Sequence, residues 1–137
     1  MSNFPLRGRT ILVIDDDEDT REVTRRLLEL LGAQVVAAAD GFEGLVQLGR
    51  LKPDAVLCDL AMPIMDGMEF ASRMRQDPRY RRVLLVAMTG RQRHADFLQT
   101  WEVGFDAHLV KPVSAEMLSS IAQRLPGNSA MGAKPGA

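Results

Sequence analysis

The chain has little of what marks a secreted, membrane-embedded or nucleic-acid-binding protein. Its 137 residues include a single cysteine, Cys58, which cannot form an internal disulfide and therefore suits a reducing compartment. No apolar run is long enough to span a bilayer, and residues 1–9 lack the apolar run and the cleavage site of a secretory signal. The formal net charge is −1, so no overall field favours nucleic acid or anionic membranes. We therefore expect a soluble cytoplasmic protein that binds neither nucleic acid nor membrane.

What is present is the composition of an ordinary globular domain. Hydrophobic residues make up 46% of the chain and charged residues 26%, and the length fits one domain with one hydrophobic core. Short apolar runs alternate five times with segments of helical periodicity. The predicted strands are 11–14, 35–38, 55–58, 83–88 and 107–110. Residues 127–137 contain too few apolar side chains to fold, so we expect a flexible tail.

The apolar spacing also predicts which helix faces are buried. The first helix is expected to bury one face made of Val23, Leu27, Leu30 and Leu31. In the fourth helix, Leu98 is expected on the core side. Ser114 is the expected N-cap of the last helix, because a serine hydroxyl there can accept from a free backbone amide.

Five strand–helix units predict an α/β fold, in which helices cover both faces of a doubly wound, five-stranded parallel sheet. In this architecture ligands bind outside the carboxyl ends of the strands. Asp15 and Asp16 follow the first strand, and Asp59 follows the third. Thr89 ends the fourth strand and Lys111 follows the fifth. We therefore expect these five side chains to converge at one edge of the sheet.

These residue types together predict a magnesium-dependent phosphoryl-transfer site. Clustered carboxylates repel one another unless a cation neutralises them. Oxygen ligands that leave the coordination incomplete favour Mg²⁺, which keeps waters and binds phosphate oxygens. Lys111 can neutralise one phosphate oxygen and Thr89 can donate to another. Asp59, alone at the central strand, is the predicted nucleophile and would form an acyl phosphate.

Four motifs in this order resemble those of the response-regulator receiver domains of two-component systems. They are Ile-Leu-Val-Ile-Asp-Asp-Asp at 11–17, Asp-Leu-Ala-Met-Pro-Ile-Met-Asp-Gly at 59–67, Thr89-Gly90 and Lys111-Pro112. The resemblance predicts a receiver domain over residues 8–126, with 1–7 as an N-terminal extension. It implies a flavodoxin-like fold with strand order 2-1-3-4-5, and a cis Lys111-Pro112 bond.

The resemblance also implies roles for the site residues. Asp59 would be the phosphoacceptor. Asp16, Asp59 and the carbonyl oxygen of Ala61 would bind Mg²⁺ directly, while Asp15 would act through a metal-bound water. A histidine kinase or phosphotransfer protein would supply the phosphoryl group, and the domain would catalyse only its own phosphorylation and dephosphorylation.

Phosphorylation in such domains is read out by a downstream protein, so a partner surface is expected. The resemblance implies that Thr89 turns toward the phosphoryl group, that Lys111 contacts it, and that His108 is the switch residue. Three aromatic residues spaced by four form the rest of the predicted surface: Phe97, Trp101 and Phe105. Ordinary core packing is the alternative for these aromatics. The fourth helix, fifth strand and fifth helix would form this face, which also offers a possible homodimer contact.

Other notable residues have simpler interpretations. Asp17, Glu18 and Asp19 are expected to begin a helix, where acidic groups favour the dipole. Asp66-Gly67 is expected to be a turn and helix entry, and Cys58 a buried strand residue without reactivity. The basic cluster is expected to be solvated surface: Arg79, Arg81 and Arg82.

Two alternatives to a stand-alone receiver remain at this point. A phosphatase that forms an aspartyl phosphate would need Asp-x-Asp-x-Thr or Asp-x-Asp-x-Val after the first strand, whereas here the fifth residue is Asp19. The chain could also be the receiver fragment of a hybrid histidine kinase. The initial Met1 and the short tail favour a stand-alone receiver.

Overall fold

The computed structural model describes residues 3–90 and 97–127, and its centre is a five-stranded parallel sheet of order β2-β1-β3-β4-β5. The strands are β1 (Thr10–Ile14), β2 (Gln34–Ala38), β3 (Ala55–Asp59), β4 (Leu84–Thr89) and β5 (Ala107–Val110). Each strand boundary lies within one residue of its predicted position. The predicted fold and strand order are therefore confirmed.

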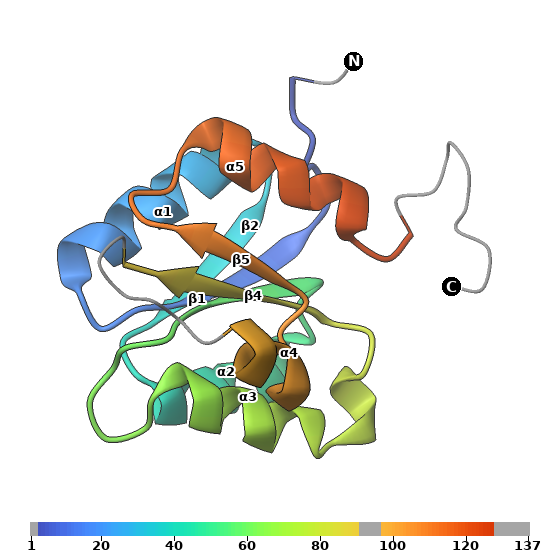
Figure 1. The fold of residues 1–137 in the computed structure, drawn as a ribbon. Coiled ribbons are helices and arrows are strands. Elements are labelled where there is room, and N and C mark those ends of the chain that lie inside the picture. Colours follow the sequence, from blue (N-terminus) through green and yellow to red (C-terminus); the bar gives the residue numbers. More distant parts are fainter. Residues whose placement is uncertain (1–2, 91–96, 128–137) are drawn as a thin grey trace.

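The helices form two layers, one on each face of the sheet. The helices are α1 (Glu18–Leu30), α2 (Gly41–Leu51), α3 (Gly67–Arg75), α4 (Phe97–Val103) and α5 (Ala115–Ser120), with 3₁₀ turns η1 (Pro78–Tyr80) and η2 (Ile121–Arg124). Figure 1 shows α1 and α5 on one face and α2, α3 and α4 on the other. The sheet is thus covered on both sides, as its continuous apolar strands require.

Successive side chains of each central strand point alternately to the two faces of the sheet and pack into two separate halves of the core. Ile11 and Val13 pack toward α1 and α5, whereas Leu12 and Ile14 pack toward α2 and α3. The core also includes Leu6, which is fully buried although it lies before residue 8, the predicted start of the domain.

Polar side chains fix where the helices begin. Asp17, Asp40 and Asp66 each cap a helix by accepting from a backbone amide of its first turn. Ser114 caps α5 through the amide of Met117, so the predicted N-cap is confirmed. The first three caps place the starts of α1, α2 and α3 beside the carboxyl ends of the strands.

Two of the predicted buried helix faces need correction. In α1, Leu27 and Leu31 pack partly buried against the core as predicted, but Val23 and Leu30 are exposed, while Thr24 and Leu28 are buried. The Thr24 hydroxyl donates to the carbonyl of Thr20 within the helix, so this polar side chain can be buried with its hydrogen bond made. In α4, Leu98 is exposed and Thr100 is the buried residue.

Candidate functional site

The site lies at the carboxyl edge of the sheet, where three strand ends deliver an acidic cluster and a lysine. Carboxylate oxygens of Asp15, Asp16 and Asp59 all lie within 4.8 Å of one another. Lys111 Nζ lies 2.9 Å from Asp15 Oδ2 and 3.4 Å from Asp59 Oδ2. Thr89 ends β4 and is buried, and its carbonyl accepts from the Lys111 amide at 2.8 Å. The five predicted residues therefore come from strand ends that meet at one edge.

Two opposing effects act on the pKa of Asp59: burial of its side chain and a neighbouring positive charge. Its side chain is almost completely buried. Burial raises the pKa of Asp59 from 3.8 to about 6; Lys111 acts against this shift, and the negative charge of Asp15 adds to it. At neutral pH Asp59 is therefore still a carboxylate, with one oxygen near Lys111 and the other accepting from the Ala61 amide at 3.2 Å.

Lys111 is the counter-charge of the cluster. Burial lowers its pKa, but the nearby carboxylate of Asp15 and then that of Asp59 outweigh burial and hold the pKa above its ordinary value. Its ammonium group is therefore charged at neutral pH. The Lys111-Pro112 peptide bond is cis, as predicted.

The donor set fits a small divalent cation. Asp15 is completely buried, and its Oδ2 accepts no hydrogen bond of ordinary geometry from the described residues, although Lys111 lies beside it. One lysine cannot neutralise three carboxylates, so the cluster keeps an excess of negative charge. Oxygen ligands that are few and partly open to solvent suit Mg²⁺, which retains waters. The carbonyl ligand from Ala61 stays a prediction.

The sequence analysis missed the groups that orient Asp15. The amide of Asp17 donates to Asp15 Oδ1 at 3.0 Å, and the Arg21 guanidinium donates to the Asp15 carbonyl at 2.9 Å. Arg21 lies one helical turn after the N-cap Asp17, and this spacing could have indicated that it turns back toward the end of β1. These contacts hold the loop in which Asp15 and Asp16 lie.

The simpler interpretations are confirmed where the structure describes them. Helix α1 begins at Glu18, and Asp66 caps α3. Cys58 is buried, and burial followed by the charges of Asp59 and Asp15 raises the pKa of its thiol well above the ordinary value. A thiolate is therefore disfavoured at this site.

The predicted aromatic surface needs one correction. Phe105 is almost completely buried in the core beside α3, so the prediction that its side chain contacts a partner is wrong. Trp101 is 49% exposed, and its ring meets the His108 ring edge-on with centroids 5.0 Å apart. The Thr100 hydroxyl is hydrogen-bonded to His108 Nε2. The side chain of Phe97 lies outside the described residues.

No helix in residues 3–90 and 97–127 is long and apolar enough to cross a membrane.

Comparisons with known proteins agree on one family. The profile of the family described as the response regulator receiver domain matches residues 11–123. The chain is 37% identical over 116 residues to the sensor histidine kinase CheAY of Helicobacter pylori, covering 83% of this chain and 14% of that protein. It is 39% identical over 114 residues to an uncharacterised 14.6 kDa protein of Leptolyngbya boryana, covering 83% and 87% respectively. The chain thus spans only a small part of the kinase.

Solved structures give the same result. The chemotaxis protein CheY4 of Vibrio cholerae matches with a TM-score of 0.79 and 29% identity, over 85% of this chain and 98% of that one. The receiver domain of sensor histidine kinase PA1611 from Pseudomonas aeruginosa, which holds magnesium in its active-site cleft, matches with a TM-score of 0.77 and 30% identity. That match covers 85% of this chain and 96% of the other.

Proposed function

The chain belongs to the family of response regulator receiver domains of two-component systems, and from this we propose that it accepts a phosphoryl group on Asp59 with the help of Mg²⁺. One observation carries the proposal. Asp59 is a buried carboxylate at the end of the central strand, beside the Lys111 ammonium group and the carboxylates of Asp15 and Asp16. A phosphoryl acceptor needs such an arrangement, because phosphoryl transfer depends on positioning and on neutralised charge.

In the proposed reaction an Asp59 oxygen attacks phosphorus while the bond from phosphorus to a histidine nitrogen of the donor breaks. The bonding electrons return to the imidazole, which takes up a proton, and Asp59 becomes an acyl phosphate. Lys111 neutralises a phosphoryl oxygen, and Thr89 turns inward to donate to another. Asp15 and Asp16 would hold Mg²⁺ together with Asp59, and the bound cation would neutralise the oxygens of the incoming phosphoryl group.

The donor in this proposal is a histidine kinase or a phosphotransfer protein, and the domain catalyses only its own phosphorylation and dephosphorylation. The output is a protein contact on the face of α4, β5 and α5. Trp101, His108 and Arg124 line a hollow of about 400 Å³ there, which suits an aromatic or aliphatic side chain of a partner or of a second copy. A cytoplasmic location stays a prediction from the sequence.

The test is Asp59→Asn, which keeps the shape of the side chain and removes the nucleophile. With phosphoramidate and Mg²⁺, intact-protein mass spectrometry should detect one added phosphoryl group on the wild type and none on the variant. Chelation by EDTA should suppress labelling of the wild type. Asp77→Asn is the matched control, because Asp77 is a partly exposed carboxylate that caps η1, pairs with Arg79 and is not part of the acidic cluster. Labelling of the Asp59→Asn protein at the wild-type rate would refute the assignment.

A further inference from the structure

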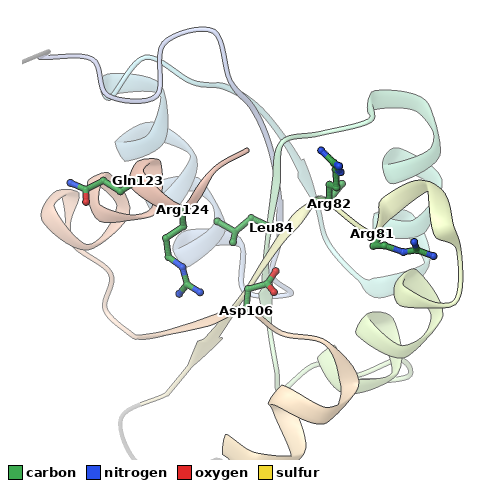
Figure 2. A pocket seen from close by; sticks show the side chains of 7 residues that line it. Arg81, Arg82, Leu84, Asp106, Gln123 and Arg124 are labelled. Atoms are coloured by element: carbon green, nitrogen blue, oxygen red, sulfur yellow. The ribbon is translucent and has the colours of Figure 1, made fainter. Parts of the chain in front are cut away.

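A second charged feature lies at the opposite edge of the sheet, where β4 and β5 begin. It is a hollow of about 330 Å³ between the residues that precede β4 and the last turn of η2. Figure 2 shows Arg124 on one side of this hollow, Arg81 and Arg82 on the other, and Leu84 and Asp106 between them. We call these five residues the basic hollow. Arg81 and Arg82 are exposed, as the sequence predicts.

The positive charge of the basic hollow is not balanced from within the described residues. The one acid there, Asp106, is already engaged: its Oδ2 accepts from Arg75 Nη2 at 2.8 Å and from the Leu85 amide at 2.9 Å. Arg81, Arg82 and Arg124 form no ion pair with a described residue, whereas nearby Arg79 pairs with Asp77. Among the described residues, the three arginines thus share the hollow with a single acid, Asp106, which Arg75 already neutralises.

The excess of positive charge at the basic hollow does not follow from the overall composition, because the whole chain has a net charge of −1. Like charges that share a hollow repel one another, and a hollow with an excess of one sign of charge concentrates ions of the opposite sign. Arginine also presents a planar fork of donors that matches a carboxylate or a phosphate. The arrangement therefore favours an anionic group between Arg124 and the Arg81–Arg82 pair.

The lining also indicates what kind of anion fits. Leu84 is buried and Val83 is only partly exposed, so the occupant meets mainly charged and polar groups, which suit carboxylates on a polar peptide backbone. The hollow is confined to one corner of the sheet, whereas nucleic acids are bound by cations that follow a long backbone. We propose that the basic hollow binds an acidic, glutamate-containing segment of a partner protein.

The position of the basic hollow would allow a partner to bind without covering Asp59. Leu84 begins β4 and Thr89 ends it, so the two sites are separated by the length of one strand, about 17 Å. An acidic segment is attracted to the basic hollow and repelled by the carboxylates around Asp59. The partner is therefore held at the far end of the domain while Asp59 stays accessible to a phosphodonor.

The proposal is tested with the unphosphorylated full chain and a fluorescein-labelled hexaglutamate peptide, followed by fluorescence polarisation. We expect binding that weakens as salt is raised, and an affinity about tenfold lower in the double variant Arg82→Gln/Arg124→Gln, because two cationic contacts are lost. Amide resonances of Leu84, Asp106 and Gln123 should shift on titration. Arg26→Gln/Arg73→Gln is the matched control: it removes the same charge from exposed positions on α1 and α3 and should bind like the wild type.

Three outcomes would overturn the proposal. One is the absence of peptide binding to the wild type. Another is an equal loss of affinity in both double variants, which would indicate a general charge effect. The third is tighter binding of a short DNA duplex than of the peptide at the same salt concentration, because the occupant would then be a nucleic acid.

Discussion

At the scale of single residues, Asp59 as the proposed phosphoacceptor has to meet two requirements that oppose each other. Burial removes water from its oxygens and so exposes them to an incoming phosphorus, but burial also favours the protonated form, which is no nucleophile. Lys111 offsets the second effect, and the pKa stays at about 6. The same ammonium group is shared with the fully buried Asp15. Lys111 therefore favours the ionised form of Asp59 and also lies against the buried Asp15.

Ile64, five residues after Asp59, has a strained backbone that a substitution can relieve. Its φ is +69°, and the Met65 amide donates to the Pro63 carbonyl at 2.7 Å across it, which makes a γ-turn of the rare, strained kind. The side chain is 85% exposed, so little burial is lost on its removal. Ile64→Gly should raise the free energy of unfolding by about 1 kcal/mol, measured by urea denaturation.

The control for this prediction is Ile64→Val, which keeps a β-branched side chain at the same positive φ. It should leave the free energy of unfolding unchanged. A glycine variant no more stable than the valine variant would contradict the inferred strain.

His108 should make the stability depend on pH. Burial lowers its pKa below the ordinary 6.5, and its neighbours are the Thr100 hydroxyl, the Trp101 ring and, in the same hollow, Arg124. Between the folded-state pKa and 6.5, the unfolded chain binds more protons than the folded chain. The free energy of unfolding therefore falls as the pH falls through this window.

His108→Gln removes this contribution and keeps a hydrogen-bonding side chain. We expect the wild type to lose stability relative to the variant as the pH is lowered from about 7.5 to about 5, a window set by the ordinary histidine pKa. Urea denaturation of both proteins across this range measures the difference. Parallel pH profiles would show that His108 titrates alike in the folded and unfolded chains.

At the scale of elements, the start of α3 is fixed by its contact with the end of β3. A Cβ added to Gly67 would lie 2.5 Å from the Asp59 carbonyl oxygen and 2.8 Å from the Leu60 Cα. Both are backbone atoms and cannot turn away, so either α3 or the end of β3 must shift. Gly67→Ala should lower the free energy of unfolding by about 1–3 kcal/mol and slow phosphoryl labelling of Asp59.

Gly49→Ala is the matched control, because it makes the same change within a helix that has room. The nearest atom to its added Cβ is the Tyr80 hydroxyl oxygen at 3.7 Å. Since alanine is the better helix former, this variant should gain about 0.5–1 kcal/mol. Thermal denaturation compares the two, and a Gly67→Ala protein as stable as the wild type would contradict the close packing.

The strands were predictable from the sequence, whereas the buried face of α1 was predictable only in part and that of α4 was not, for a physical reason. β1, β3 and β4 are buried on both faces and therefore read as unbroken apolar runs. A helix face is harder to predict, because a polar residue such as Thr24 can be buried once its hydroxyl bonds within the helix. The same applies to α4, where Thr100 is buried beside His108 while the apolar Leu98 is exposed.

The candidate site was predictable as far as strand ends determine it. Asp15, Asp59, Thr89 and Lys111 follow from the rule that parallel strands present their carboxyl ends at one edge. The basic hollow was not predictable from the sequence, because Arg82 and Arg124 are far apart in the chain. They line the same hollow only because η2 packs beside the start of β4. No rule of local spacing relates such positions.

At the scale of the whole molecule, the two ends of the domain differ in charge. The carboxyl ends of the strands carry the acidic cluster, and the amino ends carry the basic hollow. The central strands β3 and β4 are buried throughout, so salt ions cannot enter the core to screen the two charged ends from each other. If both proposals hold, an acidic partner and a separate phosphodonor would bind at opposite ends of the domain.

The segment before β1 closes the α1–α5 side of the core. Leu6 is fully buried and its amide donates to the Leu31 carbonyl at 2.9 Å, next to the end of α1. Leu6→Ala should therefore lower the free energy of unfolding by about 2–4 kcal/mol, since it removes buried surface and leaves a cavity. Leu30→Ala, the same change at a side chain that is 71% exposed, should cost far less. Urea denaturation compares the two variants. Equal losses would mean that residues before β1 add nothing to the core, whereas the expected difference makes Leu6 part of the folding unit.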